Sequence, residues 1–191
     1  MKQHSLVPGR PGTDAQGVIT PDTKDWTWVL DRPCPECGFD TQSFPRTAIP
    51  DLLRDNAAAW ADLLKGPADP RTRPQPDVWS PLEYACHVRD VCRMYHARLT
   101  LMLLIDDPHY PNWDQDQTAI RDNYPGQHPH TVATELTAAA GILADGFAAL
   151  TPTQWLRPST RSDGARFTTE SFARYFLHDP VHHLHDATAT G

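Results

Sequence analysis

Apolar residues recur at helical spacing in four separate stretches of the chain. In the first stretch, about 50–65, Leu53, Ala57, Trp60 and Leu64 follow one another at intervals of four, three and four residues. These intervals put the four side chains on one face of a helix. The pattern therefore predicts an amphipathic helix that buries this face.

The second predicted helix covers about 80–105 and has the clearest start signal. Ser80 is followed by Pro81 and, three residues after the serine, by Glu83, which is the pattern of a capping box with proline in the first turn. The apolar stripe of this helix comprises Tyr84, Val88, Val91, Tyr95, Leu99 and Met102.

Two more helices are predicted, over about 131–150 and from Thr168 to about 186. Alanine, the best helix former, fills much of the third helix. Pro180 lies inside the last one and cannot donate a backbone hydrogen bond, so we expect a kink or a new helical start there. The core face of the last helix comprises Phe172, Tyr175 and Phe176.

Long loops join these helices. The loop over about 107–130 carries a short predicted helix at 115–123, and the loop over 151–167 contains a turn at 161–164. No stretch shows a convincing strand pattern, and the chain has no internal repeat. Four helices with crossover loops predict an all-α fold, a four-helix bundle.

The chain divides into three predicted parts. Residues 1–24 are polar and rich in glycine and proline, which is typical of a flexible tail. Residues 25–46 carry two tryptophans and two phenylalanines around a Cys-Pro-Glu-Cys-Gly sequence, so we expect an irregular extension that packs on the bundle. The bundle itself is predicted to span 47–191.

Composition narrows the classes of function. The 191 residues carry 24 acidic and 17 basic side chains, a formal net charge of −7. Nucleic acids and anionic membranes need a basic surface, so neither is an expected partner. No apolar run approaches the roughly 20 residues of a membrane span, and no secretory signal is visible. We therefore expect a cytoplasmic protein that acts on a small molecule.

Histidines on the last helix are the main candidate metal ligands. His178 and His182 are four residues apart, so both side chains project from one face, one turn apart. A third ligand would complete an open metal site, and His87, beside the apolar stripe of the second helix, is the best candidate. His183 and His185 are alternatives that are better explained as exposed residues. A solvated histidine-rich helix end without metal is the competing interpretation.

Two segments resemble the DinB/YfiT-like superfamily. They are 79–90, with the sequence WSPLEYACHVRD, and 176–183, with the sequence FLHDPVHH. The resemblance covers about 47–187 and implies a four-helix bundle in which His87, His178 and His182 hold a divalent metal, zinc, nickel or iron. The sequence also resembles an actinobacterial subgroup with a Cys-Pro-Glu-Cys-Gly segment before the bundle.

The resemblance also implies a class of activity. Related proteins include metal-dependent transferases and isomerases that use a low-molecular-weight thiol such as mycothiol, and many are homodimers. A thiol S-transferase is the preferred expectation, on resemblance alone. A metal-dependent hydrolase, an Fe(II)/oxygen enzyme and a non-catalytic stress-associated metal- or ligand-binding protein are the alternatives.

Cys34 and Cys37 form a separate motif. The Cys-x-x-Cys spacing, with Pro35 and Gly38, is typical of a metal-binding turn, but tetrahedral zinc needs four ligands and no second Cys-x-x-Cys is present. A zinc site would have to recruit a distant histidine, aspartate or cysteine. A reversible disulfide and a plain reduced turn are the other interpretations.

Several single residues are weaker candidates. Asp90, one turn after His87, is a candidate catalytic or ligand-orienting carboxylate, and an exposed or capping carboxylate is an equally good interpretation. Asp114 is a candidate acid or base at a pocket mouth, or merely a helix cap. Arg161 and Arg166 could bind a substrate carboxylate or pair with surface acids. Cys86 is expected to be a small buried hydrophobic residue.

Overall fold

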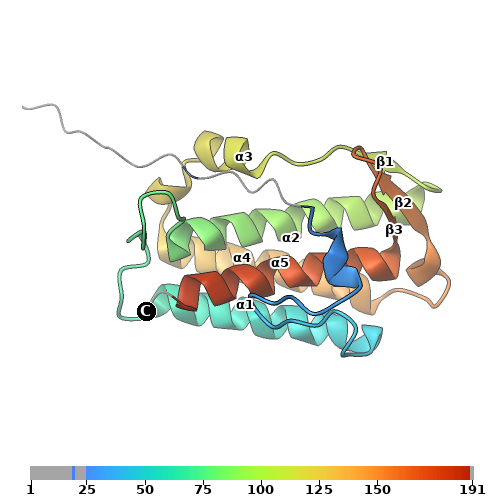
Figure 1. Cartoon of the computed structure of the whole chain (residues 1–191), viewed down its shortest axis with the longest axis horizontal. Helices are drawn as coiled ribbons and strands as arrows, with labels where there is room; N and C mark the ends of the chain where they lie inside the picture. The colour runs from blue at the N-terminus through green and yellow to red at the C-terminus, as the bar shows by residue number, and fades with distance from the viewer. Residues whose placement is uncertain (1–18, 20–24, 190–191) are drawn as a thin grey trace, which may run out of the picture.

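The computed structural model describes Ile19 and residues 25–189. The flexible tail predicted over 1–24 therefore lies, apart from Ile19, outside the described residues. Figure 1 shows the helices running along one long axis, with a small sheet at one end.

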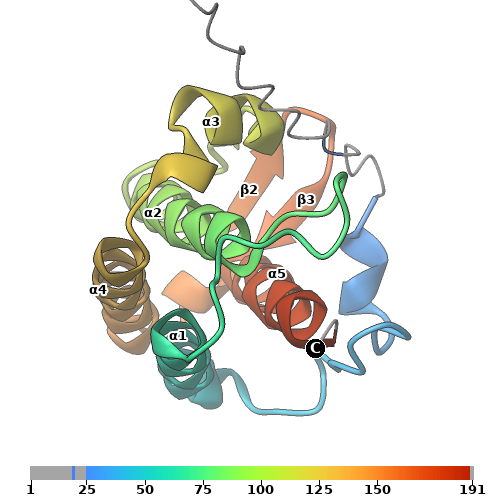
Figure 2. The same ribbon diagram turned by 90° about the vertical axis from the view of Figure 1, so that its left-hand side faces the viewer.

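Four long helices form a bundle, as the sequence predicts: α1 (Ile49–Lys65), α2 (Pro81–Leu104), α4 (Pro129–Ala148) and α5 (Thr169–Ala189). Helices α1 and α2 each pack against both α4 and α5. Seen end-on, the helices form a ring in the order α1, α4, α2, α5, so the connection from α1 to α2 crosses the ring (Figure 2).

Most residues of the predicted apolar faces are buried, but Tyr84 and Tyr175 are half-buried and line the cavity described below. Leu53, Ala57, Trp60 and Leu64 of α1 all lie in the core. The capping box is formed as expected: the Ser80 hydroxyl accepts from the Glu83 N–H, and the Glu83 carboxylate accepts from the Ser80 N–H.

Shorter helices occupy the connections. Helix α3 (Gln115–Arg121) matches the short helix predicted in the long loop. Single 3₁₀ turns occur at η1 (Thr27–Leu30), η2 (Arg46–Ala48), η3 (Tyr124–Gly126) and η4 (Gln154–Leu156).

A three-stranded sheet caps one end of the bundle, which the sequence did not indicate. Strand β1 (His109–Tyr110) pairs parallel with β2 (Pro158–Arg161), which pairs antiparallel with β3 (Arg166–Thr168). The expectation of no strands was wrong because segments of two to four residues are too short to show an alternating pattern. The predicted turn at 161–164 joins β2 to β3, with Gly164 at a φ of +93°.

Helix α5 is continuous through Pro180, so no new helix starts there. The Pro180 carbonyl accepts hydrogen bonds from the Asn56 side-chain amide (3.1 Å) and the Trp60 indole N–H (3.2 Å). Both donors lie on α1, and they fix the middle of α5 against it.

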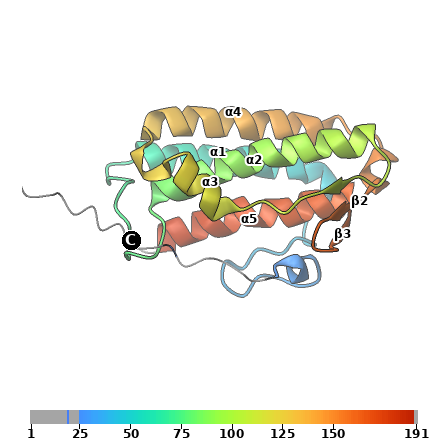
Figure 3. The ribbon, with the colours of Figure 1, turned by 90° about the horizontal axis from the view of Figure 1, so that it is seen from above.

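Residues 25–48 lie along α5 on its side facing away from α4 (Figure 3). Val29 in η1 is fully buried. The Thr41 hydroxyl donates to the Val29 carbonyl at 2.7 Å, and the Arg174 guanidinium on α5 donates to the carbonyls of Thr41 and Phe44. These contacts attach the extension to α5.

In the part of the chain that the structure describes, no helix has both the length and the apolar character needed to cross a membrane.

Candidate metal centres and the adjoining cavity

Two pairs of potential ligands alternate along α5. His178 and His182 form one pair at a spacing of four residues, and Asp179 and His183 form a second pair shifted by one residue. One residue of an α-helix corresponds to a rotation of about 100°. The two pairs therefore face different neighbours, and each meets its own additional ligands.

The first group joins Asp179 and His183 to His87 on α2, with one ligand atom from each lying within 4.8 Å of the others. The His87 Nε2 lies 3.3 and 3.4 Å from the two Asp179 carboxylate oxygens, and the His183 Nε2 lies 3.8 Å from Asp179. Metal–nitrogen and metal–oxygen bonds of about 2.1 Å place neighbouring ligands about 3.0–3.4 Å apart. The His87 and Asp179 spacing already falls in this range, and His183 is slightly more distant.

Aromatic rings hold His87 in place. Its imidazole stacks on Trp113, with ring centroids 5.3 Å apart and planes inclined by 17°, and Trp79 lies at 5.3 Å on another side. Burial opposes ionisation of Asp179, but the charges of His87 and His183 lower the pKa of Asp179 to about 2. The carboxylate is therefore ionised at neutral pH, as a metal ligand must be.

The second group consists of Cys34, Cys37, His178 and His182, whose four ligand atoms also lie within 4.8 Å of one another. The Cys34 sulfur lies 3.7 Å from the His182 Nδ1, and the Cys37 sulfur lies 3.8 Å from the His178 Nε2. The two cysteines are not joined in a disulfide.

Burial controls protonation in this second group. Burial raises the pKa of the Cys37 thiol to about 11, although a backbone interaction with Phe39 opposes the shift. Burial and the neighbouring His182 lower the pKa of His178 to about 4, and burial also lowers the pKa of His182. Both imidazoles are therefore neutral at pH 7, which is the form that binds metals.

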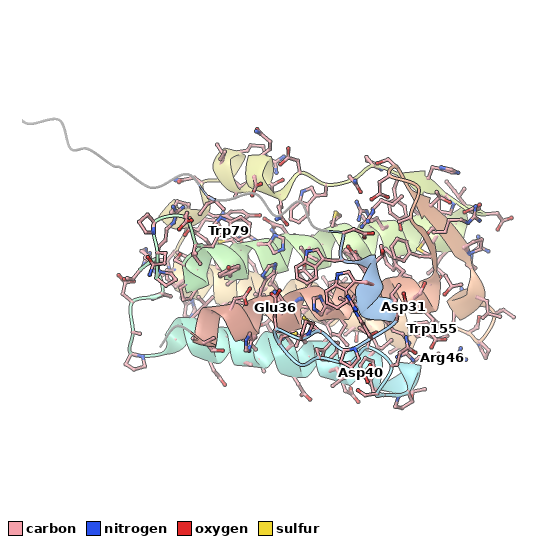
Figure 4. The ribbon with its side chains drawn as sticks, in the orientation of Figure 1. Asp31, Glu36, Asp40, Arg46, Trp79 and Trp155 are labelled. Atoms are coloured by element: carbon pink, nitrogen blue, oxygen red, sulfur yellow. The ribbon has the colours of Figure 1, made fainter. Side chains whose placement is uncertain are left out.

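A cavity of about 970 Å³ adjoins both groups. It lies between α2 and α5, with the segment before α3 and part of the extension as further walls. Trp79, labelled in Figure 4, lies near the start of α2 at one end of this region, while Glu36 lies on the extension in front of α5. His87, Asp179 and His183 all contribute to the cavity lining.

Two arginines bring positive charge to the cavity. Arg161 is paired with Asp163 and donates to the Tyr175 hydroxyl at 3.2 Å. Arg98 donates to the Pro111 carbonyl at 2.6 Å and lies over the Tyr110 ring. Within the described part of the chain, no carboxylate lies close enough to Arg98 to form an ion pair.

The sequence profile of the DinB superfamily matches residues 51–187. The chain belongs to the DinB superfamily. None of the curated protein sequences with which it was compared matches it significantly.

A solved structure shares the fold of this DinB superfamily member. It is YfiT from Bacillus subtilis, described as a probable metal-dependent hydrolase with an unusual four-helix bundle topology. The two proteins superpose with a TM-score of 0.67 at 18% sequence identity, over 75% of this chain and 86% of YfiT. At this identity the similarity establishes the fold alone.

Within this superfamily fold, the structure separates the three histidines that the sequence predicted as one metal site. His87 meets Asp179 and His183, whereas His178 and His182 meet the cysteines. A second spacing of four, from Asp179 to His183, is the sequence signal for the group that includes His87, and the neighbouring pair at 178 and 182 obscured it. The side chains that meet Cys34 and Cys37 are these two histidines.

The two predicted catalytic carboxylates have structural partners. Asp90 forms ion pairs with Arg89 (2.9 Å) and Arg93 (3.1 Å), accepts a hydrogen bond from Tyr124 (2.8 Å), and does not line the cavity. Asp114 lines the cavity but also caps α3 by accepting from the Gln117 N–H at 2.9 Å. A role for Asp114 as acid or base remains a prediction.

The remaining candidates are peripheral to both groups. Arg166 pairs with Asp107 at 3.1 Å and lies outside the main cavity. Cys86 is fully buried, and burial raises the pKa of its thiol to about 12, as expected of a small core residue.

Proposed function

We propose that this protein is a metal-dependent hydrolase whose ion is held by His87, Asp179 and His183. The observation that supports the proposal is the convergence of these three side chains, from two helices, on one point of the cavity wall. Two histidines and one carboxylate form a known catalytic ligand set, which leaves further coordination positions for water and substrate.

The polar atoms of the three residues fit a metal ion. The Asp179 Oδ1 is buried and has no hydrogen-bond partner, although it lies 3.3 Å from the His87 Nε2. Leaving a buried carboxylate oxygen without a donor is costly. A cation between the carboxylate and the two imidazoles would remove this cost.

The ion would supply Lewis acidity, which polarises a substrate oxygen and makes water nucleophilic at neutral pH. The residues of the chain control access and orientation. Trp79 and Trp113 fix the His87 ring from two sides and exclude water from it. The Asp179 charge offsets part of the charge of a divalent cation.

Carboxylates outnumber arginines in the cavity lining, and Arg98 is the side chain there that offers a binding point for an anionic group of a substrate. Arg98 is 9% exposed and lines the cavity. Burial lowers the pKa of Arg98, but the ordinary pKa of arginine is so high that the side chain stays protonated. A substrate carboxylate or phosphate would provide this guanidinium with a counter-charge.

Thiol transfer is the second candidate function. The cavity volume of about 970 Å³ is at the upper end of the range for small-molecule sites, which leaves room for a thiol and an electrophile together. In this reaction the metal would stabilise a thiolate in place of activating water. The resemblance to thiol-dependent enzymes is the other support for this candidate.

One set of assays tests both functions. Metal-loaded protein is incubated with chromogenic carboxylic and phosphoric esters, and separately with low-molecular-weight thiols and monochlorobimane. We expect ester hydrolysis that His183→Ala reduces by at least 100-fold and that the neighbouring His185→Ala, at an exposed position, leaves unchanged. Hydrolysis that persists in His183→Ala would contradict the proposal. Thiol conjugation without hydrolysis would favour the second candidate.

A further inference from the structure

We propose that Cys34, Cys37, His178 and His182 form a closed structural zinc site, distinct from the site in the cavity, that fastens the extension to α5. Two sulfur and two nitrogen ligands are a standard donor set for structural zinc. The ligands come from two segments that are more than 140 residues apart in sequence, 148 for Cys34 and His182.

The distances agree with tetrahedral zinc. Zinc–sulfur bonds of about 2.3 Å and zinc–nitrogen bonds of about 2.1 Å at a tetrahedral angle place sulfur and nitrogen about 3.6 Å apart. In the structure the sulfur of Cys34 lies 3.7 Å from the nitrogen of His182, and the sulfur of Cys37 lies 3.8 Å from the nitrogen of His178. All four ligand atoms lie within 4.8 Å of one another, so one ion can contact them all.

The backbone around the cysteines has the shape of a metal-binding turn. The Gly38 N–H donates to the Cys34 carbonyl at 2.8 Å, and the Cys34 N–H donates to the Phe39 carbonyl at 2.9 Å. Gly38 has a φ of +73°, which glycine adopts without strain and which closes the turn. The turn directs both sulfurs to the same side, towards α5.

The histidines are oriented as zinc ligands usually are. The His182 Nδ1 faces the Cys34 sulfur, while its Nε2 lies 3.5 Å from the Glu36 carboxylate and 3.5 Å from the Asp186 carboxylate. A carboxylate on the far nitrogen of a ligating histidine fixes its tautomer and raises its basicity. Glu36, between the two cysteines, thus supports a ligand on the other segment.

The site is structural because four protein ligands leave no open position. Cys34, His178 and His182 are buried, and the Trp26 ring covers both imidazoles at centroid distances of 5.3 and 5.0 Å. The zinc site and the proposed hydrolytic site therefore use adjacent residues of α5 for different purposes.

Cobalt substitution of the reduced, full-length protein tests the proposal. Only a site with thiolate ligands gives an intense sulfur-to-cobalt charge-transfer band in the near ultraviolet. We expect one such cobalt per chain, displaced by one equivalent of zinc. The band should be lost in Cys37→Ser and in His182→Ala, and retained in His87→Ala and in a Cys86→Ala, Cys92→Ala double variant.

The wild-type protein alone can overturn the proposal, so the result does not depend on the folding of any variant. Absence of the charge-transfer band in reduced, cobalt-saturated wild type would refute the site. Retention of the band in His182→Ala, with an unchanged intensity, would refute the role of the histidines. Because His87→Ala affects only the cavity site, failure here is distinguishable from failure of the proposed function.

Discussion

Asp179 is the residue on which the cavity site depends most. It is the only carboxylate in a group whose other members are imidazoles, and its oxygens lie 3.3 and 3.4 Å from the His87 Nε2. Its negative charge strengthens the attraction for a cation in a partly buried setting, where charges are weakly screened.

Replacing Asp179 with asparagine should weaken metal binding in the cavity about 100-fold, because the variant loses the anionic ligand but keeps the side-chain shape. Cobalt titration measures this affinity from the visible absorption bands that arise without sulfur ligands. Asp114→Asn is the matched control, since asparagine also caps helices and Asp114 lines the same cavity. Equal affinities for the Asp179→Asn variant and the wild type would contradict the ligand assignment.

Glu83 links the start of α2 to the preceding loop. Its carboxylate accepts from Arg73 at 2.5 and 2.9 Å and from the Ser80 N–H at 2.9 Å, and its side chain is 3% exposed. Burial opposes ionisation of Glu83, but the hydrogen bonds from Arg73 and Ser80 lower its pKa below the ordinary value of 4.5.

Glu83→Gln should lower the free energy of unfolding by about 2 kcal/mol at pH 7, because Arg73 loses its buried counter-charge. A lowered pKa in the folded state means that this contribution is complete above about pH 4.5. It disappears as the pH falls through the lowered pKa. Urea unfolding at pH 7 and pH 3 measures both effects. A difference between the wild type and Glu83→Gln that is as large at pH 3 as at pH 7 would contradict the electrostatic explanation.

At the scale of elements, the rotation of α5 about its axis decides which ligands meet. The four helices and the capping box follow from apolar spacing and local chemistry, which the sequence displays directly. The choice between the 178/182 pair and the 179/183 pair depends on packing against α2 and the extension. A difference of about 100° is smaller than the width of an apolar stripe, so periodicity could not resolve it.

This arrangement predicts that substitutions on α5 act on one site at a time. His178→Ala should remove the sulfur-to-cobalt band and leave the cavity site intact, whereas His183→Ala should do the reverse. The physical reason is that each side chain points towards a different group of ligands. Cobalt spectra of the two variants make the comparison. Loss of both spectral signatures in either variant, with the helical circular dichroism unchanged, would contradict the separation.

At the scale of the whole molecule, the zinc site would connect a loop-rich extension to a helical bundle. Trp26 and Glu36 of this extension also line the cavity, so its attachment shapes the wall opposite α2. The sequence indicated a Cys-x-x-Cys turn, but the missing ligands lay too far along the chain for local spacing to identify them. Only the tertiary arrangement brings them together.

Zinc should therefore stabilise the whole protein. At a free zinc concentration 100 times the dissociation constant, binding adds about 2.7 kcal/mol to the free energy of unfolding. For a chain of this size that corresponds to a rise in Tm of about 5–10 °C. Differential scanning calorimetry with zinc and with a chelator measures the shift. A Cys34→Ser, Cys37→Ser variant should lose most of it, and an equal shift in that variant would exclude the cysteine site as its source.

The most direct test of the two-site arrangement is a crystal structure of the zinc-loaded protein with anomalous difference maps at the zinc edge. We predict two separate peaks per chain, one bounded by Cys34, Cys37, His178 and His182, and the other by His87, Asp179 and His183. A single ion shared by His87, His178 and His182, with the cysteines uncoordinated, would contradict this account.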